Sequence, residues 1–115
     1  MPESAEQVVP QERRTSPRKA LRRRISLDFL EGRKLNGQTV DISSGGLRIT
    51  IDRSLPVPQE CAFEFTAIFD GKMQTLAGRG RILSCVCTGM HGFSIGMQFL
   101  DLNATAKAVI AGYIR

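Results

Sequence analysis

The sequence predicts a small, mainly β protein: antiparallel strands closed into a β-barrel, one α-helix at the C-terminal end, and a flexible basic arm at the N-terminal end. Three observations lead to this fold class. Apolar and polar residues alternate in most segments between residues 24 and 102, and this period of two is typical of a strand with one buried and one solvent-exposed face. Glycine, proline and asparagine separate these segments. Helical spacing of apolar residues is confined to residues 103–114.

The predicted elements follow one another with short connections. Five to seven short strands are expected, in the segments 24–30, 38–42, 47–51, 61–69, 74–86 and 92–102. Turns are expected at 31–37, 43–46 and 70–72, with a two-proline connection at 54–59. Gly78 and Gly80 fall inside a strand, where glycine usually marks a bulge, a bend or a close backbone approach. Asn103 is suited to cap the helix, and closing the strands into a barrel removes exposed sheet edges.

Positive charge is concentrated at the N-terminal end. The formal net charge is +5, and the first 24 residues hold seven Arg and Lys against three Glu. Residues 1–12 have little apolar content and two prolines, so we expect them to be disordered, with a single domain over residues 13–115. Such an arm suits a phosphate-bearing partner: a nucleic acid, a nucleotide or a lipid headgroup. The alternative is a solvated tail that only aids solubility.

Several function classes lack support in the sequence. Paired catalytic carboxylates, a nucleophile with its base, a Walker loop and a dinucleotide fingerprint are missing, so binding is a better hypothesis than an enzyme. Cys61, Cys85 and Cys87 are too few and too isolated for a disulfide framework or structural zinc, and we expect them to be buried or half-buried apolar side chains. Neither a metal nor a cofactor is expected. A membrane span and a signal peptide are also missing, which favours a cytoplasmic protein.

Two motifs could carry binding chemistry. The first is the pair Arg14 and Arg18, whose guanidinium groups can bind phosphate oxygens or the acceptor edge of guanine. The second consists of Asp41, Ser43 and Gly46 at a strand end and the following tight turn. A carboxylate there can accept hydrogen bonds from the N1–H and amino group of guanine, and glycine lets a ligand approach the backbone. An ordinary turn is the alternative for the second motif.

The order and spacing of the two motifs resemble the signature of PilZ domains, which are receptors for the bacterial second messenger cyclic di-GMP. The resemblance covers residues 12 to about 114 and includes the segment "GFSIGMQFLDL", which is similar to the last barrel strand of the family. It implies a six-stranded antiparallel barrel with a C-terminal helix. It also implies that Arg14 and Arg18 bind phosphates and guanine edges, while Asp41, Ser43 and Gly46 hold a guanine.

The resemblance also bears on ligand stoichiometry. In family members, a basic residue just before the first signature arginine is linked to an intercalated ligand dimer, and here that residue is Arg13. Two molecules of cyclic di-GMP per domain are therefore expected; the alternative is that Arg13 is one more solvated arginine. Arg48, Arg79 and Arg81 are secondary candidates for phosphate contacts, with a polar outer barrel face as the alternative.

The leading functional hypothesis is a receptor and adaptor that binds cyclic di-GMP and relays the signal as its N-terminal arm becomes ordered over the ligand. The effector is then another protein or a second copy of the chain. One alternative is a nucleic-acid-binding β-barrel that uses the basic arm. Aromatic residues make up only 6% of the chain, and Phe63, Phe65 and Phe69 share one face, which leaves few platforms for bases. The other alternative is a protein-interaction module that binds no nucleotide.

Overall fold

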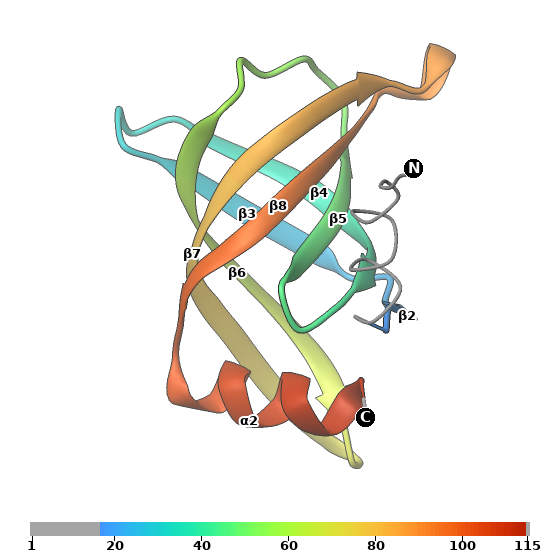
Figure 1. The fold of residues 1–115 in the computed structure, drawn as a ribbon, viewed down its shortest axis with the longest axis vertical. Helices are drawn as coiled ribbons and strands as arrows, with labels where there is room; N and C mark the ends of the chain where they lie inside the picture. Colours follow the sequence, from blue (N-terminus) through green and yellow to red (C-terminus); the bar gives the residue numbers. More distant parts are fainter. Residues whose placement is uncertain (1–16, 115) are drawn as a thin grey trace, which may run out of the picture.

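Six antiparallel strands close into a barrel in the computed structural model, which describes residues 17–114 (Figure 1). The barrel strands are β3 (Arg24–Phe29), β4 (Lys34–Ile42), β5 (Gly46–Ile51), β6 (Gln59–Phe69), β7 (Lys72–Cys87) and β8 (Phe93–Leu102). Neighbouring strands follow the order β4, β3, β6, β7, β8 and β5, and pairing between β4 and β5 closes the ring. The predicted antiparallel β-barrel is therefore confirmed.

Three shorter elements complete the described part of the chain. β2 (Lys19–Ala20) pairs with the end of β4, η1 (Gly89–His91) is a short 3-10 helix between β7 and β8, and α2 (Ala104–Tyr113) follows β8. The side chain of Asn103 caps α2 by accepting a hydrogen bond from the backbone N–H of Ala106 at 2.8 Å, as the sequence predicts. Within residues 17–114, no helix is long and apolar enough to cross a bilayer.

The core fills the barrel with apolar residues that alternate along each strand. On β3, the side chains of Ile25, Leu27 and Phe29 are buried and their polar neighbours are exposed. The same alternation buries apolar side chains of β5 and β6, namely Leu47, Ile49, Ile51, Cys61, Phe63, Phe65, Ala67 and Phe69. Because successive side chains of a strand point to opposite faces, this pattern determines which face of each strand points inward.

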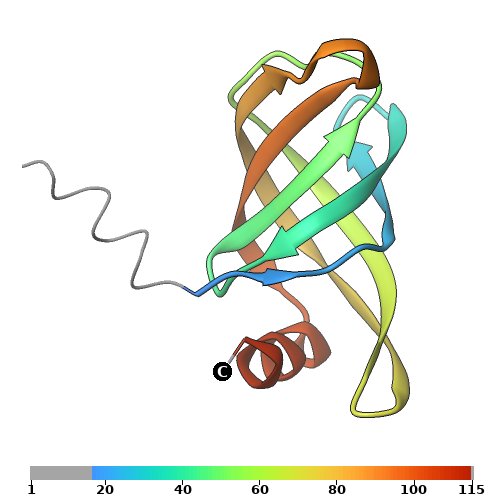
Figure 2. The same ribbon diagram turned by 90° about the vertical axis from the view of Figure 1, so that its right-hand side faces the viewer.

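The hairpin formed by β6 and β7 is longer than the barrel and supports helix α2 near its tip (Figures 1 and 2). β6 and β7 pair without interruption along the whole of β6. β3 pairs only with residues 61–65 of β6, so the rest of the hairpin extends beyond the barrel to a turn at residues 70–71. α2 packs beside this extension, with Ala106 and Ile110 buried.

The turn that the sequence predicts for residues 31–37 is only partly correct. The chain turns at residues 30–33, where Gly32 has a positive φ of 94°, and β4 starts at the next residue. Gly37 lies inside β4 for a different reason. A Cβ atom at this position would lie 2.7 Å from the carbonyl oxygen of Thr50, so glycine allows β5 to pass close by. β2 carries no periodic pattern because it is only two residues long, and the sequence does not predict it.

Gly78 and Gly80 mark an irregularity in β7, as the sequence predicts. The pairing of β7 with β8 shifts its register between Arg79 and Gly80. A Cβ atom on Gly78 would collide with the backbone carbonyl of Asp101 on β8. The two glycines therefore let β7 bend away from the barrel toward the hairpin tip while staying paired with β8.

Candidate functional site

A β-bulge in β4 turns Asp41 to the outside of the barrel. Thr39 and Asp41 pair with successive residues of β5, which leaves Val40 as an extra residue. With strict alternation, Asp41 would share the inner face with Thr39, whose side chain is fully buried. The bulge reverses the alternation, so Ile42 enters the core and the carboxylate of Asp41 reaches the surface.

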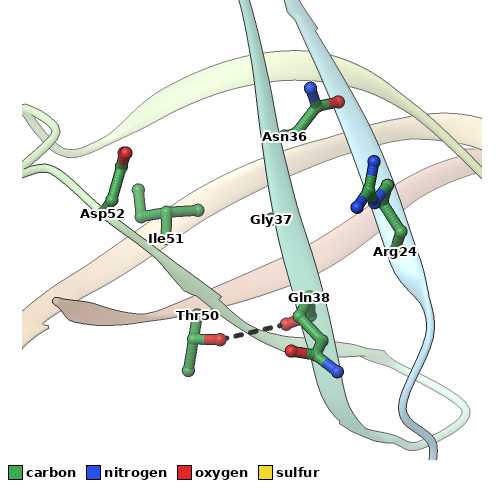
Figure 3. A pocket seen from close by; sticks show the side chains of 7 residues that line it. All are labelled: Arg24, Asn36, Gly37, Gln38, Thr50, Ile51 and Asp52. Atoms are coloured by element: carbon green, nitrogen blue, oxygen red, sulfur yellow. Dashed lines mark hydrogen bonds between the residues drawn. The ribbon is translucent and has the colours of Figure 1, made fainter. Parts of the chain in front are cut away.

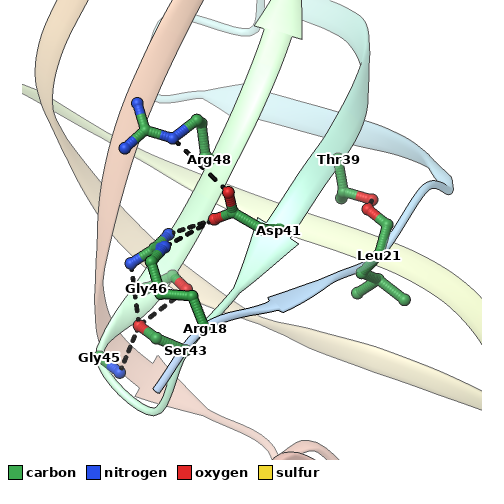
Figure 4. Close-up of polar contacts among 8 residues, drawn as sticks. All are labelled: Arg18, Leu21, Thr39, Asp41, Ser43, Gly45, Gly46 and Arg48. Atoms are coloured by element: carbon green, nitrogen blue, oxygen red, sulfur yellow. Dashed lines mark hydrogen bonds and ion pairs between the residues drawn. The ribbon is translucent and has the colours of Figure 1, made fainter. Parts of the chain in front are cut away.

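Arg18 lies beside this carboxylate because β2, which follows it, pairs with the end of β4. Its Nε and Nη2 atoms lie 2.7 and 2.6 Å from Oδ1 of Asp41, and its Nη1 donates to Oγ of Ser43 at 3.3 Å (Figure 4). The Arg18 side chain is 40% exposed and that of Asp41 is 24% exposed, so the ion pair is half-buried. The structure thus brings together Arg18, Asp41 and Ser43 from both predicted motifs.

Ser43 is held rigidly in the turn after β4. Its side chain is buried, and its Oγ accepts a hydrogen bond from the backbone N–H of Gly45 at 3.2 Å. Its own backbone N–H donates to the carbonyl of Gly46 at 2.9 Å. The same Oγ accepts from Nη1 of Arg18 at 3.3 Å and donates to the carbonyl of Gly46 at 3.5 Å, so these bonds hold the hydroxyl at a defined place beside Arg18.

Gly46 lies next to the cluster. The packing of β5 against β8 already requires a glycine at this position, whether or not a ligand binds. A Cβ atom at this position would collide with the backbone carbonyl of Met97 on β8. The sequence predicts that Gly46 leaves room for a ligand, and the structure adds that it leaves room for the neighbouring strand. Gly46 can leave room for both a ligand and β8, because it also lines the cavity described below.

Arg48, a secondary candidate in the sequence, joins the same cluster. It is opposite Asp41 in the pairing of β4 and β5, and its Nε lies 3.7 Å from Oδ2 of Asp41. The carboxylate therefore lies between two guanidinium groups (Figure 4). The three side chains together carry one net positive charge, and the side chain of Arg48 remains 50% exposed and available to an anion.

A cavity of about 350 Å³ opens beside this cluster on the outer face of the barrel. Its lining residues come from five parts of the chain and are Arg18, Ser43, Gly45, Gly46, Leu47, Arg48, Leu83, Ser84, Gly96, Met97 and Gln98. Those on β7 and β8 are not among the site residues that the sequence predicts. One signal in the sequence is the pair Ile82 and Leu83, which breaks strict alternation; Leu83 is 53% exposed and lies at a register shift in β7. Another is the interior glycine Gly96.

Arg13 and Arg14, the remaining residues of the predicted site, lie outside the residues that the structure describes. The same holds for the disorder expected of residues 1–12. Within the described residues, the predicted site consists of Arg18, Asp41 and Ser43 in direct contact, with Gly46 at the edge of the cavity.

A family model for the PilZ domain matches residues 12–115. The chain belongs to the PilZ domain family. A comparison with curated proteins found no match.

Solved structures that resemble this PilZ domain include three with low sequence identity. The Bacillus subtilis inhibitor of motility (MotI/DgrA) aligns with a TM-score of 0.74 at 9% identity, over 86% of this chain and 48% of that one. This chain thus spans about half the length of that protein. The PilZ domain of CeSA from a cellulose-synthesizing bacterium gives 0.54 at 17% identity, over 84% and 93% of the two chains. The PilZ domain of YcgR from Escherichia coli, solved with c-di-GMP, gives 0.59 at 16% identity, over 89% and 88%. At these identities the likeness shows the fold.

The other two secondary candidates of this PilZ domain lie elsewhere. Arg79 and Arg81 on β7 both contact Glu60 on β6, with N–O distances of 3.2 and 2.8 Å. The hydrogen bond from Arg81 is the main cause that lowers the pKa of Glu60 below its usual value. Arg81 is opposite Gln98, which lines the cavity, but neither arginine lines it. Like Arg18 and Arg48, these two arginines share one carboxylate, so their position outside the cavity lining is what distinguishes them from Arg48.

A larger cavity of the PilZ domain, about 540 Å³, lies where β4 and β5 separate (Figure 3). Its lining residues are Arg24, Asn36, Gly37, Gln38, Thr50, Ile51 and Asp52. Thr50 and Gln38 form the last pair between the two strands, and the Thr50 hydroxyl donates to the Gln38 carbonyl at 3.4 Å. Arg24 and Asp52 lie on opposite sides of β4 in Figure 3 and do not converge. We place the candidate site at the smaller cavity, because charged groups meet there.

The cysteines of this PilZ domain are free thiols, and no group of residues in the described part of the chain could hold a metal ion. Cys61 is buried and Cys85 half-buried, as expected. Cys87, by contrast, is exposed, because it lies at the end of β7 that extends past the core toward η1. Burial raises the pKa of the Cys61 thiol to about 11, with a smaller contribution from the negative charge of Asp28.

Proposed function

We propose that this chain is a receptor for cyclic di-GMP that acts as a signalling adaptor. The observation that carries the proposal is the convergence of Arg18, Asp41 and Ser43 beside one cavity. These side chains offer hydrogen-bond donors to phosphate, a carboxylate that can accept from guanine N–H groups, and a fixed hydroxyl. Together they match a ligand that contains both guanine and phosphate. Membership of the PilZ family supports the proposal, as does the fold shared with the YcgR domain that was solved with c-di-GMP.

Each group of the site has a separate task in this proposal. Arg18 and Arg48 bind phosphate oxygens or the acceptor edge of a guanine. Asp41 accepts hydrogen bonds from the N1–H and amino group of the same base. Its Oδ2 lies 3.7 Å from Nε of Arg48, which is beyond hydrogen-bond distance, so this oxygen can still accept from such a donor. Gly46 keeps the floor of the cavity close to the strand backbone.

The N-terminal arm completes the site in this proposal. Arg14 adds a further guanidinium to those of Arg18 and Arg48, and the arm folds over the ligand as its charge is neutralised. Arg13 adds a further contact that supports a dimer of the ligand, so two molecules bind per domain. The ordered arm then presents a new surface to an effector protein or to a second copy of the chain, which is a disorder-to-order switch. A receptor of this kind acts in the cytoplasm of a bacterium.

Binding of nucleic acid is less well supported than binding of cyclic di-GMP. The aromatic rings of Phe63, Phe65 and Phe69 are at most 8% exposed and are committed to the core. Proteins that bind single strands without sequence preference usually stack bases on exposed aromatic rings. Binding by the basic arm alone would also weaken steeply as salt is added.

Isothermal titration of the full chain with cyclic di-GMP, with GTP as the control ligand, tests the proposed function. We expect saturation near two ligands per chain. Saturation near one would keep the receptor and remove the role of Arg13. The absence of heat, together with no competition in a parallel assay, would overturn the receptor and direct attention to nucleic acid or a protein partner.

Substitutions locate the site within the same titration. We expect Arg18→Ala to abolish measurable binding, and Asp41→Ala to weaken it by about 1–3 kcal/mol through loss of the guanine contact. Arg53→Ala is a matched control, because Arg53 also pairs with an aspartate, Asp52, at 3.1 Å but lies away from the cavity. Equal affinities for Arg18→Ala and Arg53→Ala would show that the site is misplaced.

A further inference from the structure

The strand that presents Arg18 is too short to hold itself in place. β2 consists of Lys19 and Ala20 alone, and it pairs with the end of β4 through two residues. A pairing of two residues forms few hydrogen bonds, and these do not compensate for the conformational entropy that is lost when the segment becomes ordered. Further contacts must therefore hold this segment against the barrel.

The barrel supplies such contacts to the chain that follows β2. Thr39 is buried within β4, where its hydroxyl donates to the carbonyl of Leu21 (Figure 4). The same hydroxyl accepts from the backbone N–H of Arg23 at 2.8 Å. The backbone N–H of Leu21 donates to the carbonyl of Val40 at 3.0 Å. These bonds fix the chain after β2, but they do not reach Lys19 or Ala20.

The last residue of helix α2 reaches β2 directly. The Tyr113 hydroxyl donates to the carbonyl of Ala20 at 2.7 Å, which is 93 residues away in sequence. The ammonium group of Lys19 lies 5.5 Å from the centre of the same ring. The edge of the ring packs against Phe69 at the tip of the long hairpin, with 5.2 Å between ring centres. Tyr113 thus joins β2, α2 and the hairpin.

We propose that Tyr113 is a positioning residue that couples the Arg18 site to helix α2. Its hydroxyl holds the carbonyl of Ala20, two residues after Arg18, and so keeps the guanidinium oriented toward Asp41 and the cavity. Preorganisation of this kind lowers the cost of ordering on binding. Coupling is reciprocal, so a ligand that fixes Arg18 also stabilises the last turn of α2. The part of this inference that concerns ligand affinity rests on the proposed function.

Tyr113→Phe tests the inference because it removes the hydroxyl and keeps the ring against Phe69 and Lys19. We expect the Kd for cyclic di-GMP to rise about fivefold, since one neutral hydrogen bond in a partly exposed place is lost. The melting temperature should fall by only a few degrees, so the variant stays folded in the titration. Thr75→Val is the matched control: within residues 17–114 the hydroxyl that it removes bonds only that of Thr66, at 3.4 Å, on the hairpin and away from the cavity. Wild-type affinity in Tyr113→Phe would overturn the positioning role.

Hydrogen exchange provides a readout that a purely structural role would not change. In the wild-type chain, saturating cyclic di-GMP should slow exchange of the backbone N–H of Ile114, which donates to the Ile110 carbonyl at 3.1 Å in the last turn of α2. In Tyr113→Phe this ligand-dependent slowing should be lost, while Thr75→Val should retain it. Ligand-dependent slowing of equal size in Tyr113→Phe would contradict the coupling.

A ligand-free comparison separates this inference from the proposed function. Arg18→Gln removes the ion pair with Asp41, which loosens β2, and we expect faster exchange of the Ile114 N–H without any ligand. In a Tyr113→Phe background, the same substitution should add nothing further. If the wild-type chain bound no cyclic di-GMP, the proposed function would fail, and this comparison would still decide the coupling. An Ile114 exchange rate that Arg18→Gln leaves unchanged would overturn it.

Discussion

A single extra residue decides whether Asp41 serves the site or disrupts the core. Without the bulge at Val40, the carboxylate would face the barrel interior with Thr39, where an unpaired charge is very costly. With the bulge, the carboxylate meets Arg18 and Arg48 at the surface. The motif is therefore a feature of strand geometry as much as of side-chain chemistry.

Gly46 offers a test of the structural half of that motif. We expect Gly46→Ala to lower the free energy of unfolding by roughly 1–3 kcal/mol, because the new methyl group pushes against the Met97 carbonyl and separates β5 from β8. Urea denaturation measures the change. Gly45→Ala is the control one residue away, since a Cβ atom there has no neighbour within 4 Å. Equal stability of the two variants would contradict the close approach.

The residues of the site show what a sequence can and cannot reveal at this scale. Arg18, Asp41 and Ser43 are candidate binding residues by their type and spacing, and the structure brings them together. Their mutual contact could not be predicted, because it depends on β2, a strand of two residues with no periodic signal. Leu83 and Gly96 line the cavity through the register of β7 and β8, which one sequence does not determine.

Among the elements, α2 is the one whose boundaries the sequence predicts best, because Asn103 marks its start. We expect Asn103→Ala to lower the free energy of unfolding by about 1 kcal/mol, since the Ala106 N–H loses its acceptor. For a domain of this size, the melting temperature should then fall by roughly 4 °C in a thermal scan. Thr105→Ala is the control, because Thr105 is exposed and lies within the same turn. Equal melting temperatures of the two variants would show that the Asn103 cap does not stabilise the fold.

The turn after β3 shows why other boundaries are harder to predict. Asn36 and Gly37 form a dipeptide that is typical of hairpin turns. The chain instead turns around Gly32 and keeps Gly37 inside β4, where β5 passes close to the backbone. Tertiary packing thus overrides a local turn signal, and the sequence of the turn alone does not contain that information.

At the scale of the whole molecule, the closed barrel separates the thiols by their accessibility. We expect iodoacetamide at pH 8 to modify Cys87 rapidly and Cys61 very slowly in the folded chain, as measured by mass spectrometry of peptides. Cys61 is buried, and its pKa of about 11 keeps it as the unreactive thiol at this pH. Its modification should accelerate as the pH approaches that value or when denaturant opens the barrel. Equal rates in the folded chain at pH 8 would contradict barrel closure over Cys61.

The fold class itself follows from the sequence because alternation runs through nearly every strand. Ile25, Leu27 and Phe29 are one example in which each apolar residue of the pattern is buried. Closure of the ring between β4 and β5 is consistent with the need to remove sheet edges. The extension of the β6–β7 hairpin beyond the barrel provides the surface for α2. It could not be predicted, because apolar and polar residues alternate along β6 in the same way inside and beyond the barrel.

The contact between Arg18 and Asp41 also gives the proposed receptor a means of discrimination. In the ligand-free chain the guanidinium of Arg18 is already paired with the carboxylate of Asp41. A plain phosphate therefore has to displace this carboxylate, which then keeps only its longer contact with Arg48, at 3.7 Å. An adenine offers an acceptor at N1 where guanine offers N1–H, so adenine nucleotides also leave the carboxylate poorly satisfied. A ligand that supplies phosphate and guanine together compensates both groups at once. In the proposed receptor, Asp41 would therefore compete with any phosphate that arrives without a guanine, and this selection would need no steric barrier.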